Sequence, residues 1–246
     1  MATGFNRGIF IGNVVDAPET RPYGDGTKSL TRFKLAVNRG KSETLFVNST
    51  AFAGLGGICA RYLHKGSSVL VESRVQVERY TDKHGAKRQA AALVIDNMTM
   101  LGEGSNAGMN TGVWVGTLGA DPVSVKAGTK TKVRFSIAIN DPKYKSKPAV
   151  WIDVTAWEKT AEQALAVLSK GTSVAVIGRL TSRTFERKDG TKGDSVEIVM
   201  ESFQRVGRKP GGGALGGPAT VTRSSTSAQP AGDPDESLDS SDFIPF

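Results

Sequence analysis

Two aromatic side chains six residues apart occupy the polar face of a predicted strand late in the chain. Residues two apart in a strand share a face. Trp151 and Trp157 therefore lie with Asp153 on one face, while Ile152 and Val154 lie on the opposite, apolar face. Every nucleic-acid base has a flat face that stacks on an aromatic ring, whatever the base. This spacing predicts a surface that binds bases by stacking, not a catalytic centre.

The same alternation appears about a hundred residues earlier and again in a later strand of each part. Phe46 and Phe52 share a face opposite Val47 and Ala51, just as Trp151 and Trp157 do. In the later strands, aromatic side chains share a face with arginines. The predicted stacking residues of the two parts are Phe46, Phe52, Tyr80, Trp151, Trp157 and Phe185.

Basic side chains accompany these aromatics on the strands and in two turn-centred segments, 79–88 and 187–192. Lysine and arginine neutralise phosphates and release counterions, so affinity for a nucleic acid should fall with salt. A duplex has already stacked its bases, so the aromatics favour a single strand. The predicted phosphate contacts are Arg32, Lys34, Arg74, Lys83, Lys87, Arg134, Arg179, Arg183, Lys188 and Lys192.

The chain contains an internal repeat with an offset of about 105 residues. Lys65-Gly66 matches Lys170-Gly171, and Arg74 matches Arg179. A colinear series of such matches indicates two domains, 1–103 and 108–207, joined by a Gly-rich linker. Strands are expected in the first copy, and at matching places in the second, near 8–15, 30–38, 45–52, 68–80 and 88–101.

One helix is expected between the third and fourth strands of each copy. In the second copy, Thr160 and Gln163 have the spacing of a capping box, so the helix should begin at Thr160. Ala161, Leu165 and Leu168 would then face the core. Five strands with a helix in this place predict an all-β fold, a tandem pair of OB-fold Greek-key barrels. Phe10 and Trp114, in the first strands, are expected to pack in a core or interface.

Charge is distributed unevenly along the 246 residues, whose net charge is +8. Residues 210–246 contain five acids and one base, so residues 1–209 carry a net charge of +12. A basic body suits a polyanionic partner. Residues 208–246 are rich in Gly, Ser, Pro and Ala and are expected to be disordered. With one cysteine, Cys59, and no apolar run at the N-terminus, we expect a soluble, cytoplasmic protein. If the polyanionic partner is DNA, we expect the protein to be nucleoid-associated.

The motifs of common catalytic and cofactor sites are incomplete in this sequence. Gly40-Lys41-Ser42 lacks the upstream glycine of a phosphate-binding loop. Gly54–Gly57 is expected to be a loop before a helix, not a dinucleotide site. Two histidines, His64 and His84, and one cysteine cannot build a zinc set. We therefore expect no cofactor, no metal and no enzymatic activity.

Several runs resemble the bacterial single-stranded DNA-binding protein family. Gly12-Asn13 with Asp16–Glu19, and Gly116–Pro122, are similar to that family's opening strand and turn, and Tyr62–Ser67 is similar to a later run. The resemblance implies that the six aromatics are stacking residues and adds Tyr144 from a loop. Two barrels per chain are similar to the Deinococcus–Thermus variety, which implies a homodimer with four barrels.

The resemblance also extends to the acidic tip of the sequence. It implies recruitment of replication, recombination and repair proteins by Asp242, Phe243, Ile244, Pro245 and Phe246. A terminal aromatic ring and a carboxylate suit an apolar pocket ringed by cations. Ser240 and Ser241 stand where the family usually has acids.

Two other functions remain open at this stage. An RNA-binding or RNA-chaperone OB-fold protein would show similar aromatic faces, although the acidic tip argues against it. A nuclease or annealing factor that uses a metal would need a ligand cluster. The two copies also differ: the second has larger rings, so we expect the second barrel to hold single-stranded DNA more tightly.

Overall fold

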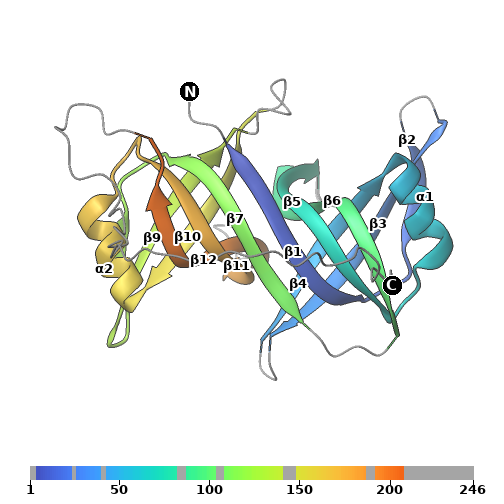
Figure 1. Ribbon diagram of the computed structural model, residues 1–246, viewed down its shortest axis with the longest axis horizontal. Coiled ribbons are helices and arrows are strands. Elements are labelled where there is room, and N and C mark those ends of the chain that lie inside the picture. Colours follow the sequence, from blue (N-terminus) through green and yellow to red (C-terminus); the bar gives the residue numbers. More distant parts are fainter. Residues whose placement is uncertain are drawn as a thin grey trace, which may run out of the picture. The chain divides into compact units, whose positions relative to one another are not determined.

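The computed structural model describes residues 4–23, 26–39, 43–81, 87–103, 108–140, 148–186 and 192–207. Strands dominate this part of the chain and form a continuous twelve-stranded sheet. The sheet is curled into two barrels, and each barrel carries one helix (Figure 1). The all-β tandem OB-fold architecture predicted from the alternation is therefore confirmed.

Five strands of the first half close into a barrel. β3 pairs with β1 and β4, β6 with β4 and β5, and β5 with β1, so the ring is complete. Of these pairs, only β4 and β6 run parallel, and the chain crosses from one to the other through α1 and β5. The elements are β1 (Phe5–Val14), β2 (Glu19–Tyr23), β3 (Lys28–Arg39), β4 (Glu43–Phe52), α1 (Ala53–Tyr62), β5 (Ser67–Thr81) and β6 (Lys87–Glu103).

The second half repeats the same pairings with the same single parallel contact, between β10 and β12. Its elements are β7 (Met109–Leu118), β8 (Val123–Ala127), β9 (Lys130–Ile139), β10 (Val150–Trp157), α2 (Glu158–Val167), β11 (Ser173–Glu186) and β12 (Lys192–Arg205). The five alternating runs predicted in each copy correspond to the five barrel strands.

Two short strands, β2 and β8, were not predicted from the sequence. β2 and β8 each form a hairpin with the strand that follows and pair with no other strand among the described residues. Pro22 lies inside β2, where it removes a backbone donor. An edge strand tolerates that loss, which explains why this segment does not read as a barrel strand.

The helices differ from the prediction at their starts. α2 begins at Glu158, two residues before the expected Thr160, and its N-cap residue Trp157 makes no side-chain capping bond. The predicted capping box is therefore wrong, because Thr160 is already inside the first turn. Ala161 and Leu168 are buried as expected, but Leu165 is 41% exposed.

In the first copy, the glycine run Gly54–Gly57 lies inside α1 and not in a loop. A Cβ at Gly56 would lie 2.7 Å from the Ser29 carbonyl oxygen, so this glycine lets the helix approach β3 closely. The Thr31 hydroxyl donates to the Gly56 carbonyl at 2.7 Å across the same contact. The run is therefore a packing feature of α1.

β1 and β7 pair antiparallel and join the two barrels edge to edge, with Gly8 opposite Gly112. Beside this seam, two asparagines at matching places extend the strand pairing inside each barrel, from β1 to β5 and from β7 to β11. Asn6 donates from Nδ2 to the Val75 carbonyl at 2.8 Å and accepts the Val75 N–H at 3.0 Å. Asn110 makes the same pair of bonds with Leu180, at 2.8 and 2.9 Å.

Phe10 and Trp114 are fully buried, each in the core of its own barrel, as expected. Their rings lie over the glycines two residues before them. A Cβ at Gly8 would be 2.6 Å from the Phe10 ring, and one at Gly112 would be 2.5 Å from the Trp114 ring. A strand with a large inward ring over a glycine therefore begins each barrel.

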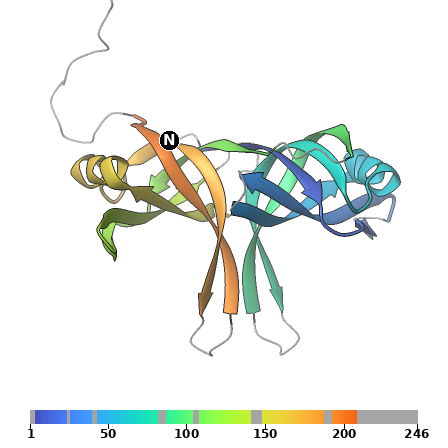
Figure 2. The same ribbon diagram turned by 90° about the horizontal axis from the view of Figure 1, so that it is seen from below.

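The hairpins β5/β6 and β11/β12 extend side by side from the same side of the sheet (Figure 2), and β6 contacts β12. They contain the longest strands of the described chain, with β6 at 17 residues. No helix among the described residues is long and apolar enough to cross a membrane.

Candidate nucleic-acid interface

The outer face of β10 presents the two tryptophans identified from the alternation. Trp151 is 54% exposed and Trp157 is partly exposed, while Ile152 and Val154 are buried in the barrel core. Thr155, on the same side as the tryptophans, is an exception. It is fully buried because its pairing places it between Arg134 of β9 and Val199 of β12.

Trp151 forms one wall of an open cleft of about 540 Å³ at β8, β9 and β10. The tryptophan ring lies over Gly119, where a Cβ would be only 2.4 Å from it. Gly119 therefore leaves room for the Trp151 ring, and both residues line the cleft that a planar ligand would enter. The cleft is lined by Gly119, Ala120, Asp121, Val123, Val125, Arg134, Phe135, Ser136, Trp151 and Asp153.

A polar group stands beside the Trp151 ring in this cleft. Asp153 accepts a hydrogen bond from the Ser136 hydroxyl at 2.5 Å and another from the Arg134 guanidinium at 3.4 Å. The guanidinium also lies 3.8 Å from Glu197, whose side chain is only 8% exposed. Arg134 is therefore shared by two carboxylates, and the Asp153 carboxylate is held in a fixed orientation while about half of its surface is exposed.

Lysines lie over aromatic rings in both barrels. The Lys132 ammonium is 4.8 Å from the centre of the Trp157 ring, and the Lys34 ammonium is 5.5 Å from that of Phe46. Each contact is a cation–π interaction, worth about 0.5–1 kcal/mol at an exposed site. A base that stacks on either ring would displace the ammonium from the ring face, and the flexible lysine could then meet the phosphate of the stacked nucleotide.

The first barrel shows a smaller and less acidic version of the same face. Phe46 is 48% exposed, Phe52 is partly exposed, and both Arg32 and Lys34 are exposed on the neighbouring β3. Asn48 is the cross-strand partner of Lys34 and takes the place that Asp153 has opposite Ser136. The central polar residue is thus neutral in one barrel and anionic in the other.

Two further predicted arginine contacts are also ion-paired, and both side chains are largely buried. Arg74 pairs with Asp96, and its side chain is 14% exposed. Arg179 lies between Glu43 of the first barrel, at 3.9 Å, and Glu201 of its own barrel, at 3.8 Å.

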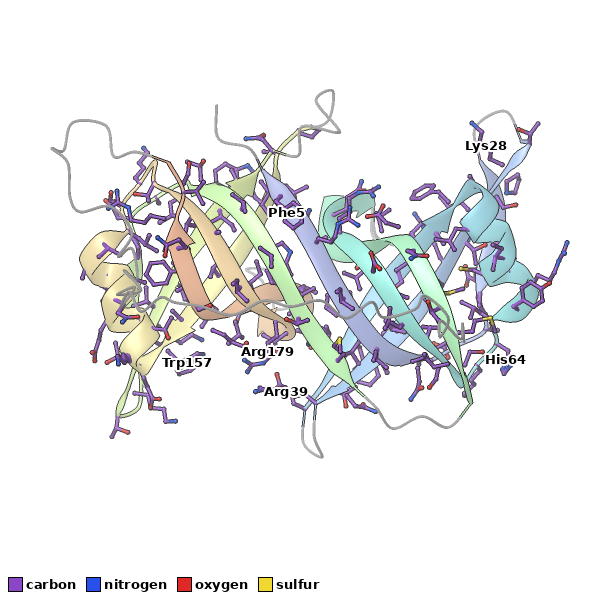
Figure 3. The ribbon with its side chains drawn as sticks, viewed as in Figure 1. Phe5, Lys28, Arg39, His64, Trp157 and Arg179 are labelled. Atoms are coloured by element: carbon purple, nitrogen blue, oxygen red, sulfur yellow. The ribbon has the colours of Figure 1, made fainter. Side chains whose placement is uncertain are left out.

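Arg39, the last residue of β3, lies beside Arg179 (Figure 3) and pairs with the same Glu43, the first residue of β4, at 3.3 Å. The Thr181 hydroxyl also donates to Glu43, at 3.2 Å. This group forms a polar connection between the barrels. A phosphate would have to compete with these acids for the guanidinium of Arg179.

The remaining predicted residues are only partly placed. The backbones of five of them lie in the long hairpin strands, so they keep their predicted elements, namely Tyr80, Lys87, Arg183, Phe185 and Lys192. Lys83, Tyr144, Lys188 and the acidic tip 242–246 lie outside the described residues. Their assignments remain predictions.

Sequence reasoning missed four residues of this surface. Lys132 and Ser136 lie on β9, beside the tryptophans of β10, and Gly119 lies against the Trp151 ring. Asp153 was noted only as a polar face-mate. Strand register alone brings Ser136 to Asp153 and Lys132 to Trp157, and register cannot be read from a single strand. In the described part of the chain, no three His, Cys, Asp or Glu side chains gather as a metal site.

Comparison with known proteins gives a consistent result over both barrels. The profile of the "Single-strand binding protein family" matches residues 5–101 and 109–206. A "Single-stranded DNA-binding protein" from Xanthomonas campestris is 32% identical over 110 residues, which is 42% of this chain and 63% of that protein. "Single-stranded DNA-binding protein 1" from Chlorobaculum tepidum is 33% identical over 117 residues, 44% of this chain and 72% of the relative.

The match to the Xanthomonas proteins spans 61–63% of their length. Among solved structures, the "wild-type single-stranded DNA binding protein from Thermus aquaticus" superposes with a TM-score of 0.67. The alignment covers 87% of this chain and 98% of the other, at 21% sequence identity. At that identity the likeness shows a shared two-barrel fold.

Proposed function

Because the chain belongs to the Single-strand binding protein family, we propose that it binds single-stranded DNA with little dependence on base sequence. The observation that carries this proposal is the pair of exposed aromatic faces at matching places in the two barrels, each with a lysine over one ring. Rings that stack on any base, with cations beside them for the backbone, suit a ligand of variable sequence.

Binding would proceed by stacking and counterion release. Bases of the strand stack on Trp151 and Trp157 in the second barrel and on Phe46 and Phe52 in the first, each stack contributing about 1–3 kcal/mol. Lys34 and Lys132 would meet the intervening phosphates, so affinity falls as salt rises. A labelled oligo(dT) titrated against the protein, with matched RNA and duplex DNA as competitors, tests the proposal. RNA binding as tight as DNA would favour the RNA-binding alternative.

The second barrel is proposed to bind more tightly than the first. The two tryptophans of β10 have larger rings than the phenylalanines of β4. Trp151 also lines a cleft, whose other residues could contact a base stacked on its ring. Replacing Trp151 and Trp157 together by alanine should therefore weaken oligo(dT) binding more than replacing Phe46 and Phe52. Equal losses would contradict this ranking.

A homodimer with four barrels is part of the same proposal. β7 pairs with β1 on one side and with β11 on the other, so the outward-facing residues of these three strands form one sheet face. That face exposes Phe5, Ile9, Met109 and Ile177, each by 37–45%. An apolar sheet face of this kind is typical of an interaction surface.

Charge on this face suits a second copy of the chain. Arg7 and Glu72 lie 3.6 Å apart, and two copies related by a twofold axis could exchange these partners. Light scattering of the parent and of Ile9→Asp tests the dimer. The parent should have the mass of two chains and the variant the mass of one, and a monomeric parent would contradict the proposal.

Recruitment of replication, recombination and repair proteins is proposed for the acidic tip, Asp242–Phe246, in a cytoplasmic, nucleoid-associated protein that is not an enzyme. The support is the sequence itself: an acid followed by two phenylalanines and a proline suits an apolar pocket ringed by cations. Removing 242–246 should spare oligo(dT) binding and abolish capture of such partners. A large loss of DNA affinity would contradict this division of roles.

A further inference from the structure

The second barrel presents a carboxylate where the first barrel has an amide. Asp153 lies between Trp151 and Trp157 on the wet side of β10 and lines the same cleft as Trp151. A stacking surface needs no acid, and an anion near a DNA backbone is repelled by phosphate. The ion pair with Arg134 accounts for the charge of Asp153, but not for the exposed half of its carboxylate beside the stacking ring.

The Asp153 carboxylate is held ready to accept hydrogen bonds. Ser136 donates to one of its oxygens and Arg134 to the other. An ionised carboxylate has about four acceptor sites, so each oxygen keeps free capacity. The side chain is 47% exposed, which leaves this capacity open to the cleft. The result is a pair of adjacent acceptors fixed next to an aromatic wall.

We propose that the cleft between Trp151 and Asp153 is a base-selective subsite that takes guanine, on the premise that the protein binds single-stranded DNA as proposed above. Guanine presents two adjacent donors, N1–H and the 2-amino group, on its Watson–Crick edge, and they match the two carboxylate oxygens. Single-stranded bases are commonly read on this edge while their faces stack.

The other bases fit this arrangement less well. Thymine has one donor, N3–H, between two carbonyl oxygens that a carboxylate repels. Cytosine and adenine each offer an amino group next to a ring acceptor. The first barrel lacks this selectivity, since Asn48 is neutral and faces Lys34 across the strand pair. One subsite out of several then adds a modest guanine preference to otherwise sequence-tolerant binding.

The test compares three labelled oligonucleotides of equal length: d(GT) repeats, d(IT) repeats and oligo(dT). Inosine stacks as a purine but lacks the 2-amino group, so the d(GT)/d(IT) affinity ratio isolates the second hydrogen bond. A good bidentate contact discriminates by about 1–3 kcal/mol. Because Asp153 is partly exposed, its contact should fall at the low end of that range. The full-length protein should therefore bind d(GT) about threefold to tenfold more tightly than d(IT).

Asp153→Asn should bring this ratio close to one, while its overall affinity rises with the loss of a negative charge. Asparagine is already tolerated at the matching place, Asn48, so the barrel should keep its fold. Glu162→Gln, on the exposed side of α2, removes the same charge away from the cleft and should leave the ratio unchanged. Anisotropy titrations measure all three proteins.

Two results would overturn the subsite: equal affinity of the parent for d(GT) and d(IT), or the same ratio in the parent and in Asp153→Asn. Either result would leave single-stranded DNA binding intact, with Asp153 acting only as a charge near the backbone. Failure of the parent to bind any of the three oligonucleotides would refute the proposed function itself. The two failures are therefore distinguishable.

Discussion

Truncating Trp151 to alanine should separate DNA binding from stability. The ring is 54% exposed and contributes little to the barrel core, whereas Trp114 is fully buried. Removing a stacking platform costs about 1–3 kcal/mol per base, which is roughly a 5- to 150-fold loss in affinity. Truncating a core tryptophan costs about 3–5 kcal/mol of folding stability, and Trp151→Ala should cost well under that.

Fluorescence and denaturation measure the two quantities on the same samples. Oligo(dT) should quench the emission of Trp151 and Trp157 and leave that of Trp114, which is shielded in the second core. Trp151→Ala should therefore show weaker binding and a smaller quench, with a urea midpoint near that of the parent. Phe46→Ala is the matched control in the first barrel and should lose less affinity. Unchanged oligo(dT) affinity in folded Trp151→Ala would refute the stacking argument.

Three substitutions and one change of pH test the fold and its chemistry. Gly56→Ala should destabilise the protein by about 1–3 kcal/mol, because its Cβ would lie 2.7 Å from a backbone oxygen. A Cβ at the neighbouring Gly57 would have no atom within 4 Å, so Gly57→Ala should raise the free energy of unfolding by about 0.5–1 kcal/mol. Urea unfolding that shifts both variants in the same direction would contradict this. Asn6→Ala should lower the free energy of unfolding by about 1–3 kcal/mol, because it removes the side chain that pairs with the Val75 N–H and carbonyl. A variant that unfolds thermally at the same midpoint as the parent would contradict this. Burial raises the pKa of the Cys59 thiol from 9.0 to about 11, so the folded state favours the protonated form. The free energy of unfolding should therefore fall as pH rises from 9 through 11. Alkylation of the native protein should be slow at pH 8, and a thiol that reacts in the native state as fast as in urea would contradict this.

The fold could be predicted from the sequence because barrel strands have one dry face. Strict alternation in segments such as 46–52 and 151–157 located the strands, and the repeat supplied a second, independent copy of the same pattern. The helix start could not be predicted in this way. Glu158 takes a φ of +49° and its counterpart Ala53 a φ of +54°, so each copy turns directly from strand into helix without a side-chain cap. No residue type announces that turn.

The exposed aromatics of the candidate site could be predicted from the sequence, but the contacts around them could not. Exposed aromatics follow from alternation within a single strand, so Trp151 and Phe46 were found. Contacts between strands depend on register, which decides that Lys132 meets Trp157 and that Ser136 meets Asp153. The same limit applies to charge: Arg179 was expected to be open to phosphate, but Glu43 of the other barrel lies 3.9 Å from it.

The most direct test of single-stranded DNA binding is an oligo(dT) titration at several salt concentrations, followed by tryptophan fluorescence. The logarithm of the affinity should fall linearly with the logarithm of the salt concentration, with quenching at each salt and far weaker binding of duplex DNA of the same length. Equal affinity for duplex and single strand, or salt-dependent binding without any quench, would contradict the proposed stacking surface.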